Sequence, residues 1–372
     1  MRKGWEYKKL NEVCEKGASN IVINKLTDNS GEYPLFGASG LVKNIDFFHQ
    51  DKPYIGIVKD GAGVGRVNIY PAYSSLVGTM QYIFPKEGYS IDFIKYFLVK
   101  LDLSHCVSGA TIPHIYFKDY GKENIPTPSL ATQLAIVAEL DKINELIRLK
   151  KEQLKDFDNL AQSLFYEMFG DPVENEKGWE VKKLGEVCEV TSAKRVFIDE
   201  VVESGVPFIR GTELTALSKL VPGEKMDYTL FITYEHYERL KAITGVPKIG
   251  DLLIPSINAD GIVWMVDTED PLYFKDGRVL WVHVNHEYYN SIAIQKLMNV
   301  LIKNVFTSMG GATFAELKLF VLRNMNVPTP PLSVQDAFSE KIKQIDAQKL
   351  QVKKSIQDLE TLLASRMQYW FE

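Results

Sequence analysis

The 372-residue sequence has few cysteines and no long apolar run. Three cysteines, Cys14, Cys106 and Cys188, cannot form a disulfide framework. Cys14 and Cys188 hold the same place in two copies of one phrase, so we expect both to be small buried residues. No apolar run reaches the ~18 residues that a membrane-spanning helix needs, and the first residues, MRKGWEYKKL, lack the apolar stretch of a secretory signal. We therefore expect a cytoplasmic protein.

Excess charge and catalytic motifs are also missing. The net charge of −5 is not that of a typical nucleic-acid binder, although a local basic face can be offset elsewhere. The sequence has no phosphate-binding P-loop, no C-x-x-C or H-E-x-x-H metal motif and no nucleophile elbow. The glycine-rich DGAGVGR, from Asp60, lacks the spacing of a dinucleotide site, and we expect it to be a hairpin turn. We expect no catalytic residue, no metal ligand and no cofactor in this chain.

What the sequence does have is an internal repeat. KGWEYKKLNEVCE, from Lys3, returns as KGWEVKKLGEVCE from Lys177, with 11 identities in 13 residues. A second pair of segments matches further on: GATIPHIYFKDYGKENIPTPSLATQLA from Gly109 and GATFAELKLFVLRNMNVPTPPLSVQDA from Gly311. The offset between the copies grows from 174 to 202, so the second copy carries about 28 extra residues in its middle. Similar ends around a dissimilar middle indicate one frame used twice, with a different centre each time.

Each copy ends in a heptad pattern that follows the helix-breaking PTP. At roughly 35 residues, each helix would be ~50 Å long and would need a partner for its single apolar stripe. We expect the two helices to pack on each other as an antiparallel coiled coil; the alternative is that each packs only on its own globule. Lys150, Lys349 and Arg366 interrupt the pattern. The residues expected in the seam are Ile136, Leu140, Ile143, Ile147, Leu154, Phe157, Phe338, Ile342, Ile345, Val352, Ile356 and Leu359.

The middles are predicted to mix strands and helices. Strands are expected in YIGIV and RVNIY, on either side of the glycine turn, and in TMQYIFP, VPFIRGTEL, GDLLIPSI, GIVWMV and RVLWVHV. Helices are expected in DFIKYFLVKL and NSIAIQKLMNVLIKN. We therefore predict an α+β protein with two mixed α/β domains in a pseudo-two-fold repeat. The predicted domains cover 1–129 and 171–331, and the long helices cover 130–170 and 332–372.

This layout resembles the DNA-specificity subunit of type I restriction-modification enzymes. The likeness rests on the repeated opening phrase, on VPFIRGTEL and KDGAGVGR, and on the GAT and PTP segments before each helix, and it covers nearly the whole chain. The resemblance implies two target-recognition domains, each reading one half of a bipartite asymmetric DNA site, with the coiled coil setting their spacing. It also implies two docked modification (methyltransferase) subunits that bind S-adenosylmethionine, and restriction subunits that use ATP.

Candidate DNA contacts are polar or basic residues beside the predicted strands, since such side chains read base edges and bind phosphates. Each of them is also an ordinary choice for a solvated surface or turn. Gly109 and Gly311 are expected to serve the backbone, through a positive φ or a close approach. The candidates are Lys43, Lys59, Arg66, Ser108, Thr111 and His114 in the first copy, and Lys194, Arg195, Arg210, Thr212, Asn258, Lys275, Arg278 and Thr313 in the second.

Two other hypotheses are compatible with the sequence. The globules could bind proteins, with the helices merely spacing them, which would make the chain an interaction scaffold that does not bind DNA. The chain could also be an enzyme with a nucleotide in the DGAGVGR loop.

Overall fold

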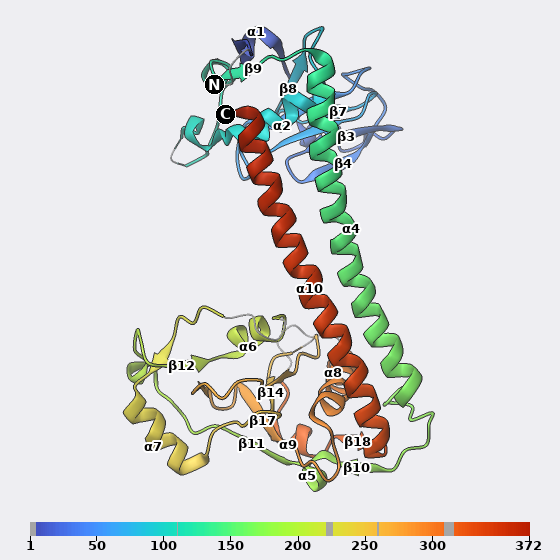
Figure 1. The fold of residues 1–372 in the computed structure, drawn as a ribbon, viewed down its shortest axis with the longest axis vertical. Helices are drawn as coiled ribbons and strands as arrows, with labels where there is room; N and C mark the ends of the chain where they lie inside the picture. Colours follow the sequence, from blue (N-terminus) through green and yellow to red (C-terminus); the bar gives the residue numbers. More distant parts are fainter. Residues whose placement is uncertain (1–4, 110, 221–225, 259, 309–315) are drawn as a thin grey trace. The chain divides into compact units, whose positions relative to one another are not determined.

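The computed structural model describes residues 5–109, 111–220, 226–258, 260–308 and 316–372 (Figure 1). The chain divides into two compact units: unit 1 holds residues 1–150 and 355–372, and unit 2 holds residues 151–354. Each unit therefore contains a globular part and a section of both long helices. The predicted α+β class is confirmed.

Unit 1 contains nine strands, counted over its described residues. They form a four-stranded sheet in the order β2-β8-β5-β6, a three-stranded sheet β4-β3-β7 and a two-stranded sheet β1-β9. The strands are β1 (Tyr7–Lys9), β2 (Cys14–Ala18), β3 (Tyr33–Gly37), β4 (Gly40–Ile45), β5 (Tyr54–Val58), β6 (Val67–Tyr70), β7 (Ser75–Leu76), β8 (Met80–Pro85) and β9 (Asn124–Pro126). The helices are α1 (Leu10–Val13), η1 (Ile23–Leu26), α2 (Ile91–Leu101), η2 (Leu103–Cys106), α3 (Phe117–Tyr120) and the first part of α4 (Leu130–Phe169).

Unit 2 repeats these three sheets in the same order: β11-β17-β14-β15, β13-β12-β16 and β10-β18. Its strands are β10 (Val181–Lys183), β11 (Glu189–Ser192), β12 (Val206–Ile209), β13 (Phe231–Ile232), β14 (Leu252–Pro255), β15 (Trp264–Met265), β16 (Tyr273–Phe274), β17 (Val279–His283) and β18 (Asn326–Pro328). Its helices are α5 (Leu184–Val187), η3 (Ile198–Glu200), α6 (Gly211–Leu217), α7 (Tyr234–Thr244), α8 (Ser291–Ser308), α9 (Leu319–Arg323) and the first part of α10 (Leu332–Phe371). The middles, dissimilar in sequence, thus share one topology.

The repeated phrases meet in the two-stranded sheets. Tyr7 pairs with Pro126 across β1 and β9, and Val181 pairs with Pro328 across β10 and β18. A threonine extends each pairing: Thr127 N–H donates to the Glu6 carbonyl at 2.8 Å, as Thr329 N–H does to Glu180. The opening phrase of each copy is therefore kept because it hydrogen-bonds to the closing one. Cys14 and Cys188 are both buried, as predicted.

A buried glutamine fixes the start of each long helix. Gln133 donates through Nε2 to the Pro128 carbonyl at 2.9 Å and accepts from Ser90 N–H at 2.9 Å. Gln335 makes the equivalent bonds to Pro330 at 2.7 Å and from Asn290 at 2.9 Å. Both side chains are almost completely buried, at 1% and 0% exposure, so each helix leaves its globule in a fixed direction.

Within unit 1, α4 packs against the last turns of α10. Ile136 and Leu140 share a core with Met367 and Phe371. Arg366, predicted to interrupt the heptad, donates through Nη2 to Glu139 at 3.0 Å, and this bond holds the pKa of the Glu139 carboxyl below its usual range. The early part of one helix thus meets the late part of the other.

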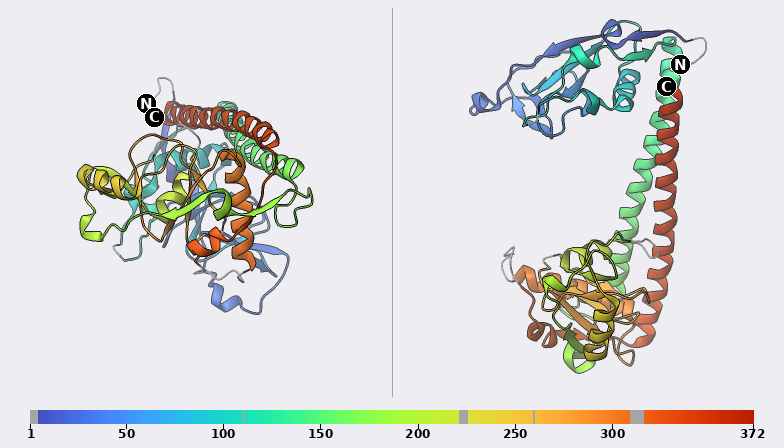
Figure 2. Two further views of the ribbon diagram at one scale, coloured as in Figure 1. Left: turned by 90° about the horizontal axis from the view of Figure 1, so that it is seen from below. Right: turned by 90° about the vertical axis from the view of Figure 1, so that its left-hand side faces the viewer.

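Within unit 2, the remaining sections of these helices also run antiparallel (Figure 2). Lys349, another interruption of the heptad, pairs with Asp158 at 2.6 Å, and Phe338 packs on Phe169 with ring centroids 4.9 Å apart. The later residue of α4 in these two contacts, Phe169, meets the earlier residue of α10, Phe338, as expected for antiparallel helices. Nine of the twelve residues expected in the seam are buried, and Leu154, Phe157 and Leu359 are half-buried. The coiled coil is therefore confirmed in both units.

The predicted strand VPFIRGTEL is only partly correct. Strand β12 ends at Ile209 and helix α6 starts at Gly211, because the Glu213 carboxylate accepts the backbone N–H of Arg210 at 3.0 Å and caps the helix. Together with α7, this helix occupies the extra length of the second middle. Among the described residues, no helix is both long and apolar enough to cross a membrane.

Candidate nucleic-acid interface

The candidate site in each unit lies where an inner strand of the four-stranded sheet ends, β5 in unit 1 and β14 in unit 2. In unit 1, β5 ends next to Lys59, whose carbonyl accepts the N–H of Ile115 at 2.9 Å. In unit 2, β14 ends next to Ser256, whose carbonyl accepts the N–H of Leu317 at 2.6 Å. Ile115 and Leu317 are equivalent positions of the repeat, so both sites occupy the same place in the frame but carry different side chains.

In unit 1, four of the six predicted residues come together beside this strand end. Ser108 and His114 exchange backbone hydrogen bonds of 2.9 and 2.8 Å, which close the turn that carries the exposed Thr111. His114 also forms a β-bridge with Asp60, next to Lys59. Gly109 has φ +91, and a Cβ there would lie 2.4 Å from the Ile112 carbonyl oxygen, so the predicted need for glycine is confirmed. Gly311 lies outside the described residues.

The other two residues of unit 1 direct their side chains to backbone carbonyls outside this cluster, although the Arg66 carbonyl accepts the N–H of Val58, at the end of β5, at 3.0 Å. Lys43 is on β4, and its ammonium donates to the Leu26 carbonyl at 2.7 Å. Arg66 follows a turn in which Gly61, Gly63 and Gly65 all have positive φ, and it donates to the Ala38 carbonyl at 2.8 Å. Strands β5 and β6 pair on either side of this turn, so the predicted hairpin is confirmed.

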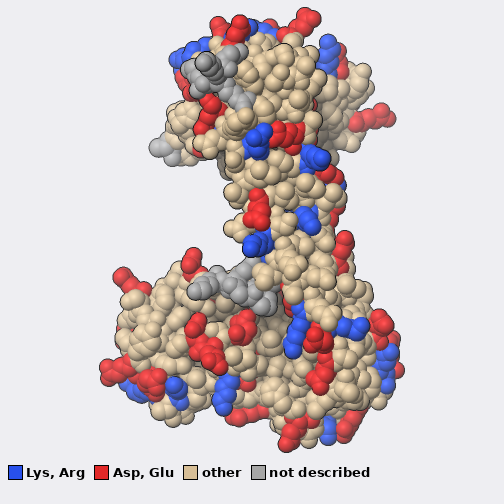
Figure 3. All heavy atoms as spheres, viewed as in Figure 1, with Lys and Arg blue, Asp and Glu red and all other residues tan. Residues whose placement is uncertain are grey.

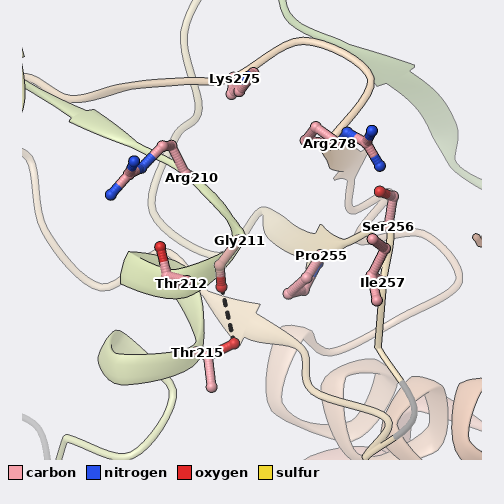
Figure 4. A pocket seen from close by; sticks show the side chains of 9 residues that line it. All are labelled: Arg210, Gly211, Thr212, Thr215, Pro255, Ser256, Ile257, Lys275 and Arg278. Carbon is pink, nitrogen blue, oxygen red and sulfur yellow. Dashed lines mark hydrogen bonds between the residues drawn. The ribbon is translucent and has the colours of Figure 1, made fainter. Parts of the chain in front are cut away.

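In unit 2, four predicted residues line one open pocket of about 580 Å³, together with Ser256 and Thr215 (Figure 4). They are Arg210, Thr212, Lys275 and Arg278. Figure 4 shows Lys275 and Arg278, which come from the turn between β16 and β17, across the hollow from Thr212 and Thr215 on α6. Three cations and several hydroxyl groups around one hollow suit the phosphates and base edges of a nucleic acid.

Two of the pocket cations are held by carboxylates. Arg210 binds Glu213 through Nη2 and Nε at 2.7 and 3.1 Å, and Arg278 lies 3.3 Å from Glu316. Burial favours the neutral acid at Glu213, but the hydrogen bonds from Arg210, from Thr212 and from backbone N–H groups outweigh it and lower its pKa to about 2. Glu213 is therefore charged at neutral pH and fixes the direction of the Arg210 guanidinium.

Two more predicted residues of unit 2 lie beside β16 and the turn that follows it. The exposed Arg195 pairs with Asp276 at 3.1 Å, and the backbone of Lys194 donates to the Tyr273 hydroxyl at 2.9 Å. On the face drawn in Figure 3, basic and acidic side chains alternate over both units. The predicted basic contacts of unit 2 thus lie near one turn, within a surface of mixed charge.

The structure does not support the predicted DNA contact at Asn258. We predicted a DNA contact, but the residue is 3% exposed, and its side-chain amide donates to the carbonyl and accepts the N–H of Ile262, both at 2.6 Å. This amide closes a turn and has no free face for DNA. Thr313 lies outside the described residues.

Sequence reasoning missed Glu213, Ser256 and Glu316. Glu213 follows Arg210 at the spacing of a helix cap and could have been found from that signal. Ser256 and Glu316 are 60 residues apart and meet at 3.3 Å only because the returning segment lies beside the end of β14. Nothing local in the sequence indicates that contact.

Comparisons with known proteins identify the family of the chain. The family model for the type I restriction modification DNA specificity domain matches residues 2–156 and 176–361. Two type I restriction enzyme specificity subunits of Methanocaldococcus jannaschii are similar. The MjaIX subunit is 22% identical over 90% of this chain and 85% of its own length; the MjaVIII subunit is 24% identical over 77% and 71%.

Solved structures share the fold. The S subunit of a type I restriction-modification system from M. genitalium aligns with a TM-score of 0.57 and 16% identity, over 99% of this chain and 96% of that one. A chain from a study of complex assembly and conformational transition in the type I restriction-modification system aligns with a TM-score of 0.61 and 18% identity, over 99% and 97%. Because the family model covers both copies of the repeat, the chain belongs to the type I restriction-modification DNA specificity family, as the subunit that recognises DNA sequence and not a catalytic one.

Proposed function

We propose that each globular domain reads one half of a bipartite, asymmetric DNA site in the cytoplasm. We assign the reading domains to residues 1–129 and 171–331 and the spacer helices to 130–170 and 332–372. The observation that carries this proposal is the equivalent position of the two candidate sites, at the ends of β5 and β14, with different side chains at each. The same frame with different side chains at its two sites suits a DNA site whose two halves have different sequences.

The proposed contacts in the second half-site are the pocket residues Arg210, Thr212, Lys275 and Arg278, with Lys194 and Arg195 beside them. In the first half-site they are Lys59, Ser108, Thr111 and His114, with Lys43 and Arg66 as additional candidates. Thr313 is also proposed as a DNA contact, on the basis of the sequence alone. Lys275 is exposed and comes from the turn between β16 and β17, which makes it the best placed for a direct contact.

We further propose that the coiled coil docks two methyltransferase subunits and, through the assembled complex, the restriction subunits. The helices carry apolar side chains that their own seam does not cover: Leu146 and Leu149 in unit 1 are 40% and 46% exposed, and Leu160 and Leu350 in unit 2 are 52% and 41% exposed. Such side chains favour burial against a partner. S-adenosylmethionine and ATP would then be bound by the partner subunits.

The test compares single alanine variants, one per unit, in the complex with the methyltransferase subunit. Selection from random duplexes should give a split consensus for the wild type. Lys275→Ala should lower affinity, by about 1–3 kcal/mol if the residue reads a base. A phosphate contact would instead reduce the slope of log affinity against log salt by about 1.

The matched variant is Lys59→Ala in unit 1. We expect Lys275→Ala to alter preference in one half of the consensus and Lys59→Ala in the other half. Uniform binding of random duplexes by the wild-type complex would reject DNA reading and favour a protein scaffold. Changes in the same half from both variants would reject the assignment of one domain to each half.

A further inference from the structure

A cluster of mixed donor atoms lies in unit 1, outside the candidate interface. A nitrogen of His105, the Sγ of Cys106 and a carboxylate oxygen of Glu123 all lie within 4.8 Å of one another. Helix η2 supplies the first two residues, and Glu123 directly precedes β9. Cys106 is partly exposed, whereas Cys14 and Cys188 are buried. Imidazole, thiol and carboxylate are the usual protein ligands of Zn²⁺.

The hydrogen bonds of His105 fix which of its nitrogens can bind a metal. Nδ1 lies 2.8 Å from the Asp102 carbonyl oxygen, so it carries a proton and donates it. Nε2 therefore faces Glu123, with the carboxylate oxygen 3.2 Å away. A carbonyl that accepts the far N–H of a histidine is the usual support of a metal-binding imidazole, because it holds the tautomer and the ring direction.

The distances suit a small divalent ion. Bond lengths of about 2.0–2.2 Å to nitrogen and oxygen place tetrahedral N and O ligands roughly 3.3 Å apart, close to the 3.2 Å between His105 Nε2 and Glu123. A thiolate needs about 3.6 Å from either atom, so the Sγ of Cys106 would have to move by up to roughly 1.2 Å from the 4.8 Å limit of the cluster. A side-chain rotation at this partly exposed residue is sufficient for such a movement.

The second copy of the repeat lacks these donors. At the offset of 202 residues, which holds from Gly109 onward, Met325 takes the place of Glu123, and Thr307 and Ser308 end α8 in the region where unit 1 has η2. The frame thus folds without the cluster in unit 2, where these three positions are still helical or directly precede β18. The three donors of unit 1 are not required by the frame itself.

We propose that His105, Cys106 and Glu123 bind a divalent transition metal of the Zn²⁺ type, with water in the fourth position. Binding releases the Cys106 thiol proton to solvent as the metal–sulfur bond forms. The ion ties η2 to the segment before β9, at the base of the turn that carries Ser108, Thr111 and His114. Metal binding itself does not depend on the proposed function. An effect of the bound metal on DNA reading would depend on it.

The first test uses the unmodified full-length chain. Cys106 should be the one cysteine alkylated in the folded protein, and stoichiometric Zn²⁺ should protect it at least about tenfold, with EDTA restoring the reaction. Millimolar Mg²⁺ should give no protection, because nitrogen and sulfur donors disfavour it. An unchanged alkylation rate with Zn²⁺ would overturn the proposal.

The second test follows Co²⁺ binding to the same chain by absorption spectroscopy. A sulfur-to-cobalt charge-transfer band should appear and reach its maximum at one Co²⁺ per chain. The variant H105T/C106S/E123M, which installs the residues of the second copy, should lose the band. His49→Gln, at an exposed histidine outside the cluster, should keep it.

Single replacement of His105 or Glu123 should weaken Co²⁺ binding by on the order of tenfold or more, since loss even of an outer-sphere partner has that effect. Co²⁺ binding without a sulfur band, or with equal affinity in the triple variant, would contradict the assignment. Circular dichroism identifies a variant that fails to fold, and in that case the alkylation test on the unmodified chain decides.

Discussion

At the residue scale, unit 2 depends on a few buried carboxylates with well-defined partners. Glu213 has a side chain only 9% exposed and receives hydrogen bonds from Arg210, Thr212 and the Arg210 backbone. Asp251 is held in the same way by His283 at 3.1 Å, by the Trp281 indole at 3.0 Å and by the Lys248 backbone at 3.0 Å. Burial raises the pKa of Asp251, but these bonds outweigh it, so the net pKa is lowered.

Glu213→Gln should make the stability of the protein less dependent on pH. The folded pKa of about 2 lies below the ordinary value of 4.5, so the carboxylate stabilises the fold above pH 4.5, and this contribution is lost as the pH falls through 2. The difference corresponds to about 3 kcal/mol at pH 7 and roughly half of that at pH 3. Urea unfolding of wild type and variant at both pH values measures it.

The matched control for this variant is Glu238→Gln. Glu238 is also paired with a residue three positions away, Lys241 at 3.5 Å, but its side chain is 64% exposed. We expect its effect on unfolding to be small, because the ion pair is exposed to solvent. A pH-independent loss at Glu213 equal to that at Glu238 would contradict the role given to the buried pair.

At the scale of elements, the helices were predictable and the candidate sites only partly so. The heptad is a local pattern, so both long helices followed from the sequence, including the charged interruptions that Asp158 and Glu139 now explain. The partners of Arg278 and Ser256 could not be predicted, because they meet through the order of strands in a sheet. Asn258 was misread for the same reason: its side chain is used by a turn, which sequence pattern does not describe.

Leu140→Asp should destabilise unit 1 strongly. Leu140 is completely buried between α4 and the end of α10, so the change removes apolar packing and buries a charge. We expect a loss of about 3–5 kcal/mol or more, measured by urea unfolding, together with reduced co-purification of the methyltransferase subunit. Leu134→Asp on the same helix, at a residue 53% exposed, should change stability by only about 0.5 kcal/mol. Equal losses in both variants would contradict the packing described for α4.

At the scale of the whole molecule, one frame is built twice along a single chain. Both copies have the same three sheets, the same pairing of opening and closing phrases and the same buried glutamine before the long helix. This repetition was visible in the sequence because the frame ends are conserved between the copies. The shared topology of the middles was not, because their sequences differ while their strand order is the same.

Lengthening the helices should alter the spacer of the recognised DNA and neither of its halves. Seven residues inserted into both α4 and α10, after Lys150 and after Lys354, keep the heptad register and add about 10 Å. We expect the preferred spacer to change by roughly 3 base pairs, at 3.4 Å each, as measured by selection from random duplexes.

The control insertion adds four residues to α4 alone. It breaks the register against α10, so we expect lower stability and loss of a defined spacer. An unchanged spacer after the paired insertion would reject the role of the helices as a ruler.

The two-stranded sheets β1-β9 and β10-β18 have an evolutionary consequence. Each middle leaves and re-enters its frame through strands that are hydrogen-bonded to each other, so the middle is a closed cassette. Recombination between related genes, with crossovers in the repeated phrases, can replace one cassette while the pairing of the strands that flank it is kept. A single genetic event can thus exchange a whole middle while both ends of the frame stay hydrogen-bonded to each other.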